Sequence, residues 1–363
     1  MKPLLFPLLA LAVLAGCESV TPPAPTARGN GEEIIVATDS ATWAGPVGDA
    51  LRETLGQPIV TLPSNQGAFR LRFQPLTNRF FEALKIQPNL VFAAPIDAEG
   101  PIGDFLRSRV GEQNLASVRA GQSAAINLRD DLWAREQLVT VATAASDSLL
   151  ASQIRARGPE LRRRYQELAR RRTQTEMFSR LRQTDVEADL FERHGFAIGI
   201  QHDYVPVQDT TVTVAGRTGT FIRFRRVLSD TWRDFFVFQQ DGVAALPPED
   251  EMDDVTNGLL ERFALGSYDG SFVQLDDQRP MERDTTSVGG RPAREQRGFW
   301  YMTEDVMGGS YVRYTIVDDA SDRLFVYYGM TFAPDRTLDK RKLLRQMEAI
   351  AFTLQTEPND PQE

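Results

Sequence analysis

The chain has 363 residues, enough for two domains of ordinary size, and a formal net charge of −9 from 41 Lys and Arg against 50 Asp and Glu. This acidic balance argues against nucleic acid as a partner and against attachment to an anionic membrane by general electrostatics. A single cysteine, Cys17, excludes a framework of disulfides within the chain.

The first seventeen residues have the order of an export signal. Lys2 is basic, and Leu4–Leu14 is apolar apart from Pro7. That run is only about eleven residues long, whereas a membrane-spanning helix needs about twenty. The quartet Leu14-Ala15-Gly16-Cys17 resembles the lipobox of bacterial lipoproteins. The resemblance implies cleavage after residue 16 and a lipid anchor, with diacylglycerol on the Cys17 sulfur and a palmitate-type acyl chain on its amine. The alternative is an ordinary secretory signal with a chance cysteine.

The segment after the cysteine predicts a tether. Residues 17–32 are rich in Pro, Gly, Ser and Thr and contain almost nothing to bury. Cleavage would remove only Lys2 among the charged residues, so 40 basic against 50 acidic side chains give a mature net charge of −10. By analogy with lipoprotein sorting, the absence of Asp at position 18 favours the outer membrane. No acidic cluster follows the cysteine, which favours an anchor that faces the periplasm rather than export to the surface.

Residues 33–183 form the first predicted domain, which is expected to be of α/β type and to end in a basic helix. Glu33–Ala37 reads as a strand, Pro46 opens a helix that ends at Gly56, and Phe69–Phe73 alternates like a half-buried strand. A short helix near residues 80–84 and three more strands are expected, in the stretches NLVFAA, SAAINL and QLVTVATA. The domain closes with two helices, Ser148–Arg157 and Pro159 to about Arg182.

Residues 184–355 form the second predicted domain, followed by a polar tail at 356–363. After a short helix that ends at Gly195, six strands are expected, in FAIGI, FIRFRRV, DFFVFQQ, RGFWYM, YVRYTIVD and RLFVYYGMTF. One helix at about Asp253–Phe263 divides them, and a last helix carries an apolar stripe from Leu343 to Leu354. The fold class expected is therefore α+β, with two consecutive domains of mainly antiparallel sheet packed with helices. The second is similar in element order to the PsbP/Mog1-type sandwich.

Three stretches together resemble an uncharacterised family of Bacteroidetes lipoproteins, a domain-of-unknown-function family: Asp39–Leu51, Asp131–Gln137 and Arg297–Asp318. The third is the most specific. Its Gly298, Trp300, Met307, Gly308 and Gly309 fit the family pattern of a Gly-aromatic-Trp strand followed by Met-Gly-Gly. Ser310-Tyr311 stands where the family usually has Pro-Phe. The resemblance implies an envelope lipoprotein and brings no activity with it.

The Met307-Gly308-Gly309 segment is the first candidate interaction site. Its two glycines permit close backbone approach, and Trp300, Tyr301 and Tyr311 would be aromatic anchors of the kind that interfaces favour. The alternative is a bulged hairpin. Trp43, in a Gly-rich strand-to-helix segment, either packs locally or forms the other half of a shared cleft.

A basic helix is the second candidate. Residues 155–182 hold ten arginines and three glutamates, and Arg162, Arg163 and Arg164 are the expected contacts with an anionic surface. The alternative is a solvated helix that pairs with the protein's own acids. The acidic run Pro248–Asp254 lacks the alternation and central Gly of a calcium loop. With Cys17 acylated and only two histidines, no metal site of familiar spacing is expected, and no cofactor is predicted.

The function expected from these residues is a binding or assembly factor of the envelope. Its partners would be the membrane, through the lipid anchor, and another envelope protein. The alternative is an envelope hydrolase that cleaves glycans or similar substrates with a pair of carboxylates, since such chemistry needs neither His nor Cys.

Overall fold

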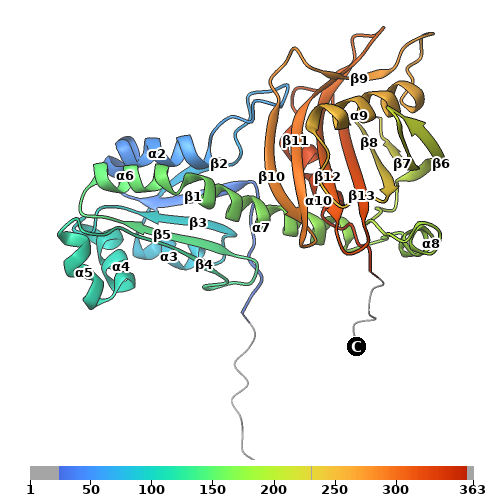
Figure 1. The fold of residues 1–363 in the computed structure, drawn as a ribbon. Coiled ribbons are helices and arrows are strands. Elements are labelled where there is room, and N and C mark those ends of the chain that lie inside the picture. Colours follow the sequence, from blue (N-terminus) through green and yellow to red (C-terminus); the bar gives the residue numbers. More distant parts are fainter. Residues whose placement is uncertain (1–23, 230, 358–363) are drawn as a thin grey trace, which may run out of the picture.

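A computed structural model of the protein describes residues 24–229 and 231–357. Cys17, the predicted leader and the start of the predicted tether therefore lie outside the described residues, as does most of the polar tail. Within the described part, no helix combines the length and apolar character that a membrane span requires. Two sheet-based domains lie side by side, joined by the long helix α7 (Gly158–Phe178) (Figure 1).

The first sheet has the strand order β2-β1-β3-β5-β4. Its strands are β1 (Glu33–Thr38), β2 (Arg70–Pro75), β3 (Asn89–Ala93), β4 (Ala125–Asp130) and β5 (Leu138–Thr143). The first three pairings are parallel, and only β4 runs antiparallel, against β5. The expectation of a mainly antiparallel first sheet is thus wrong. Helices cross between the strands and cover both faces, which is the usual setting of parallel strands.

Helices cover both faces of this sheet. One face carries α2 (Pro46–Leu55), α6 (Asp147–Ala156) and α7, and the other carries α3 (Asn78–Leu84) and α4 (Gly100–Val110). Two short helices, α1 (Ser40–Ala44) and α5 (Glu112–Arg119), complete the domain. Successive side chains of strand β1 point to opposite faces of the sheet and so enter different cores. Ile34 and Val36 enter one core and Ile35 and Ala37 the other.

The second sheet is antiparallel, with the order β10-β11-β12-β13-β8-β7-β6 and a short strand β9 beside β11. Its strands are β6 (Val205–Val214), β7 (Arg217–Val227), β8 (Trp232–Asp241), β9 (Val273–Asp276), β10 (Glu282–Val288), β11 (Arg291–Met302), β12 (Gly308–Asp318) and β13 (Arg323–Phe332). Together with the first domain this gives the α+β class that the sequence predicts.

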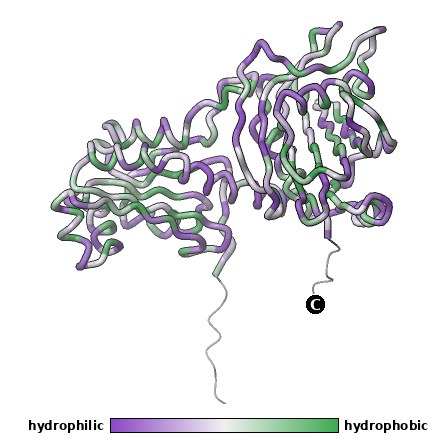
Figure 2. The backbone as a smooth tube through the Cα atoms, in the orientation of Figure 1, coloured by the Kyte–Doolittle hydropathy of each residue, from purple (hydrophilic) through white to green (hydrophobic). Residues whose placement is uncertain are grey.

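Both faces of the second sheet are buried. Helix α9 (Glu249–Phe263) packs on one face, while α10 (Lys340–Ala351) and α8 (Thr184–His194) pack on the other. The central strands are accordingly buried along most of their length, but they mix apolar with polar residues, and Figure 2 shows them in purple, white and green. The apolar stripe predicted for the last helix supplies Leu344, Met347 and Ile350 to the core.

Several elements differ from the expectation. Phe196–Ile200, predicted as a strand, holds only an isolated bridge between Ala197 and Gln355, because its side chains fill the core beside α10 without sheet partners. Strands β6, β9 and β10 were not expected, since they are short or polar and lie at the sheet margin. The basic helix ends at Phe178, a few residues before Arg182.

The predicted tether is shorter than residues 17–32. Ala27 N–H donates to the Arg135 carbonyl at 2.9 Å, and Arg135 N–H donates to the Pro25 carbonyl at 2.8 Å. Arg28 N–H donates to the Ile86 carbonyl at 2.7 Å. Residues 25–28 are thus fixed to the first domain by backbone hydrogen bonds, which their Pro- and Gly-rich composition did not indicate.

Candidate functional site

Of the three aromatic residues proposed as anchors, Tyr301 is exposed, whereas Trp300 and Tyr311 are core residues. Trp300 is 1% exposed and Tyr311 0% exposed. The Trp300 indole Nε1 donates to the Thr331 carbonyl at 3.2 Å, and the Tyr311 hydroxyl accepts from Gln296 at 2.8 Å. Side chains without exposed surface cannot anchor a partner, so this interpretation of Trp300 and Tyr311 is corrected. The physical reason is that α9 covers the sheet face on which they lie.

The two glycines of this segment belong to strand β12. Gly308 and Gly309 pair with Tyr301 and Trp300 across the β11–β12 hairpin, and half-buried Met307 precedes them. A Cβ at Gly309 would lie 2.0 Å from the Thr331 carbonyl oxygen. Glycine is needed here for close packing of neighbouring strands, and the geometry is that of a hairpin.

Trp43 has only local contacts in the first domain. Its ring stacks on Phe73 with centroids 5.8 Å apart, and the Arg52 guanidinium lies 4.1 Å from its centroid. Gly48 sits against it, because a Cβ there would lie 1.9 Å from the Trp43 carbonyl oxygen. Trp300 packs on Phe332 in the other domain. The structure does not bring the two tryptophans together in one cleft.

The basic helix borders a charged pocket of about 400 Å³, which we call the α7 pocket. One wall is α7 and the other is the end of β4 with the turn that leads into β5. Its lining combines three arginines, three carboxylates, a threonine and one leucine: Arg164, Arg171, Arg172, Asp130, Asp131, Glu136, Thr175 and Leu168. A cavity with both signs of charge on a rigid helix suits a small charged ligand.

Two of the three pocket arginines are already engaged. Arg164 forms ion pairs with Asp130 at 2.6 Å and with Glu167 at 3.2 Å. Arg172 donates to the Asn89 side chain and to the Pro88 carbonyl, both at 2.9 Å, and to the Glu136 carbonyl. Burial lowers the pKa of Arg172 to about 10. These two side chains hold the pocket walls together.

The predicted surface contacts Arg162, Arg163 and Arg164 do not act as a set. Arg163 is exposed, Arg162 is half-buried, and Arg164 is paired with acids of the same domain. Successive residues on a helix point in different directions, so three adjacent arginines cannot share one face. The ion pairs of Arg164 agree with the alternative interpretation, in which the helix pairs with the protein's own acids.

The turn opposite the helix is conformationally unusual. Asp131 has φ +52° and Glu136 has φ +59°, a left-handed backbone that side chains other than glycine seldom adopt. Buried Gln137 holds the turn, because its side-chain amide donates at 2.8 Å to the carbonyls of Lys85 and Gln87. The carboxylates of Asp131 and Glu136 are therefore displayed from a fixed backbone.

The opposite edge of the first sheet carries a second group of acids. Asp39 follows β1 and caps α1, accepting from the Thr42 backbone and hydroxyl at 2.8 Å. Asp147 follows β5, and its Oδ1 is buried with no hydrogen-bond partner in the described chain. Burial, and then the charge of Asp39, raise the pKa of Asp147. The carboxyl edge of a parallel sheet is where such folds commonly bind ligands.

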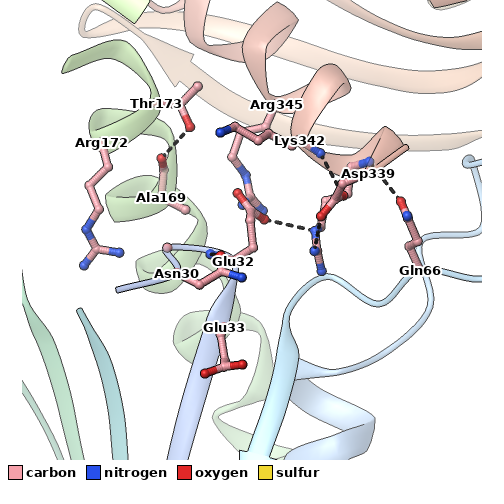
Figure 3. Close-up of polar contacts among 12 residues, drawn as sticks. Asn30, Glu32, Glu33, Gln66, Ala169, Arg172, Thr173, Asp339, Lys342 and Arg345 are labelled. Atoms are coloured by element: carbon pink, nitrogen blue, oxygen red, sulfur yellow. Dashed lines mark hydrogen bonds and ion pairs between the residues drawn. The ribbon is translucent and has the colours of Figure 1, made fainter. Parts of the chain in front are cut away.

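The two domains meet through a buried ion-pair cluster. Glu32, just before β1, pairs with Arg341 at 3.0 Å and with Arg345, both on α10. Figure 3 shows Glu32 turned toward α10 while Glu33 points away. Around it, Gln66 accepts from the Arg341 backbone at 3.0 Å and Ser310 donates to the Thr61 carbonyl at 2.6 Å. This junction has a structural role, since its charges are satisfied.

The remaining polar candidates are also explained by packing. Glu249 and Asp253 of the acidic run pair with buried Arg313 at 2.8 and 2.6 Å. His194 ends α8 and lies 3.1 Å from Asp209. No group of three or more His, Cys, Asp and Glu side chains in the described ranges is arranged to hold a metal ion.

The sequence reading missed Arg171, Asp131 and Glu136. A signal for Arg171 was present, because buried Leu161, Tyr165 and Leu168 define the packed stripe of α7. An arginine three residues after Leu168 must lie beside that stripe. The acids come from a turn more than thirty residues earlier, and only the fold places them opposite the helix.

The two halves of the chain match two family models, each a domain of unknown function. Residues 183–353 match DUF4837 and residues 27–178 match DUF8532. No curated protein matches. A crystal structure from Bacteroides thetaiotaomicron VPI-5482 is similar at 13% identity, with a TM-score of 0.24 over 45% of this chain. The match spans 46% of that chain, less than half of its length.

Proposed function

We propose that the protein is a lipid-anchored binding or assembly factor of the bacterial envelope, of the Bacteroidetes lipoprotein type. Acyl chains on Cys17 hold it in the outer membrane, and its two domains face the periplasm. Two or three acyl chains suffice for stable anchoring of an acidic protein that electrostatics would not hold.

The position of the α7 pocket supports this proposal. Thr26 forms a bridge with Arg135, in the same turn that contributes Asp131 and Glu136 to the pocket. The chain that would lead to the anchor therefore enters the first domain beside a cavity lined with both signs of charge. A binding site at the anchored end of the protein fits a factor that works at the membrane surface.

Cell fractionation tests the proposal. The wild-type protein should appear in the outer-membrane fraction with a mature N-terminus at Cys17 and the added mass of acyl chains. Cys17→Ser should leave the protein unacylated and outside that fraction. In-cell cross-linking should recover an envelope protein with the wild type only. A wild-type protein with an unmodified Cys17 would refute the anchor.

A carboxylate-dependent hydrolase is the second candidate, and Asp147 is the observation that favours it. A carboxyl group with a raised pKa beside a second carboxylate is the arrangement of a general acid. The test is release of reducing ends from envelope glycans. The wild type should be active and Asp147→Asn at least about a hundredfold slower. Equal release by both proteins would dismiss this candidate.

A further inference from the structure

The α7 pocket contains charged side chains whose hydrogen-bonding groups are not fully used by the described chain. Within the described chain, the Arg171 guanidinium makes no hydrogen bond or ion pair, and neither does the Glu136 carboxylate. Asp131 accepts one bond, from the Gln137 backbone at 3.2 Å, which leaves its second oxygen free. One cation and two carboxylates thus face a cavity whose other charged groups are satisfied.

The free groups define the chemistry of a ligand. A guanidinium fork suits an anionic group such as phosphate. A pair of carboxylates accepts hydrogen bonds from a primary ammonium, which has three donors. Buried Leu168 is the apolar residue of the pocket lining. An anion alone would meet the repulsion of three pocket carboxylates, whereas a zwitterion matches both signs.

The location of the pocket points to membrane phospholipid as a source of such a ligand. The Arg135 side chain donates to the Thr26 hydroxyl at 2.8 Å, so the N-terminal segment lies against the pocket turn. Seven residues lie between Cys17 and Pro25, and the eight residue-to-residue steps span at most about 28 Å. If Cys17 is acylated, the pocket reaches the headgroup layer of the leaflet that holds the anchor.

We infer that the α7 pocket binds a phosphoethanolamine group, with the phosphate on Arg171 and the ammonium on Glu136 and Asp131. The existence of the binding site is inferred from the residues that line the pocket and does not depend on the lipid anchor. The choice of a phospholipid headgroup as its source rests on the proposed lipid anchor. A soluble phosphoethanolamine ester has the same chemistry, and the experiment separates the two sources.

Isothermal titration of the full-length acylated protein in nonionic detergent tests the site. Glycerophosphoethanolamine should bind. Glycerophosphate, which lacks the ammonium, and glycerophosphocholine, whose ammonium has no N–H, should each bind at least about tenfold more weakly. Equal binding of all three, or no binding, would overturn the inference.

Variants locate the binding. Arg171→Gln and Glu136→Gln should each weaken glycerophosphoethanolamine at least about fivefold, while Arg163→Gln, an exposed change on the same helix, should leave its affinity unchanged. All three positions are exposed, so the variants should keep the wild-type melting temperature. Wild-type affinity in both pocket variants would show that the ligand binds elsewhere.

Nanodiscs separate the two sources. With phosphatidylethanolamine in the bilayer, headgroups should occupy the pocket and lower the apparent affinity for the soluble ester relative to phosphatidylcholine discs. Equal affinities would overturn the lipid source and assign the soluble ester. The intact mass of the same preparation reports acylation of Cys17 separately. A failed anchor and a failed pocket therefore give different results.

Discussion

At the scale of single residues, the close packing of strands at Gly309 can be tested by measuring the free energy of unfolding. An added Cβ would lie 2.0 Å from the Thr331 carbonyl oxygen, so Gly309→Ala must displace β12 from β13. We expect a loss of about 1–3 kcal/mol in the free energy of unfolding. Gly31→Ala is a matched control, because its Cβ would meet only the end of Arg172, at 4.0 Å. Urea unfolding of both variants checks this, and equal stability would contradict the packing argument.

The raised pKa of Asp147 leads to a second prediction, which concerns how folding stability depends on pH. Its pKa is raised in the folded protein by burial and by Asp39, so the folded state favours the protonated carboxyl. The stability that this group contributes is present below its unfolded pKa of about 3.9 and is lost as the pH rises through the raised folded pKa. Relative to Asp147→Asn, the wild type should lose stability over that range.

Denaturation of both proteins between pH 3 and 7 measures the difference. Asp39→Asn should reduce the effect, because asparagine keeps the helix cap and removes the neighbouring charge. A difference that does not change with pH would mean that the Asp147 carboxyl titrates normally.

At the scale of elements, the attachment of β1 to α10 depends on one carboxylate. Glu32 is the ion-pair partner of Arg345 and one of two for Arg341. Glu32→Gln removes the ion-pair partner of the buried Arg345 guanidinium and should cost about 3–5 kcal/mol. Glu33→Gln, one residue later, breaks only the pair with exposed Arg72 and should cost less than about 1 kcal/mol. Similar unfolding midpoints for the two variants would refute the difference.

The elements also show what the sequence could predict. Strands with clear alternation and helices with a clear apolar stripe were placed within a few residues, as for β2 and α10. The parallel first sheet was missed although β1, β3 and β5 are continuous apolar runs, a pattern typical of strands buried on both faces. Polar edge strand β6 carried no such pattern. The α7 pocket joins segments distant in the chain, and burial of Trp300 depends on where α9 packs, so neither could be read from local sequence.

At the scale of the whole molecule, the junction should hold the two domains together without the covalent link. Leu62 of the first domain and Met177 at the end of α7 both enter the core beside α10. Gln174 donates to the Ala349 carbonyl at 2.9 Å, in addition to the Glu32 cluster. A protease site inserted next to Leu181, which is 74% exposed, would cut the chain between α7 and α8.

We expect the cut protein to migrate as one species in gel filtration at micromolar concentration, because an apolar contact and a buried ion-pair cluster act together. The same cut in Glu32→Gln should release separate halves, whereas the cut in Glu33→Gln should not. Dissociation of the cut wild type would mean that only the α7–α8 connection keeps the domains adjacent. If the halves stay together, the start of β1 is held to α10 by noncovalent contacts that include the Glu32 ion pairs.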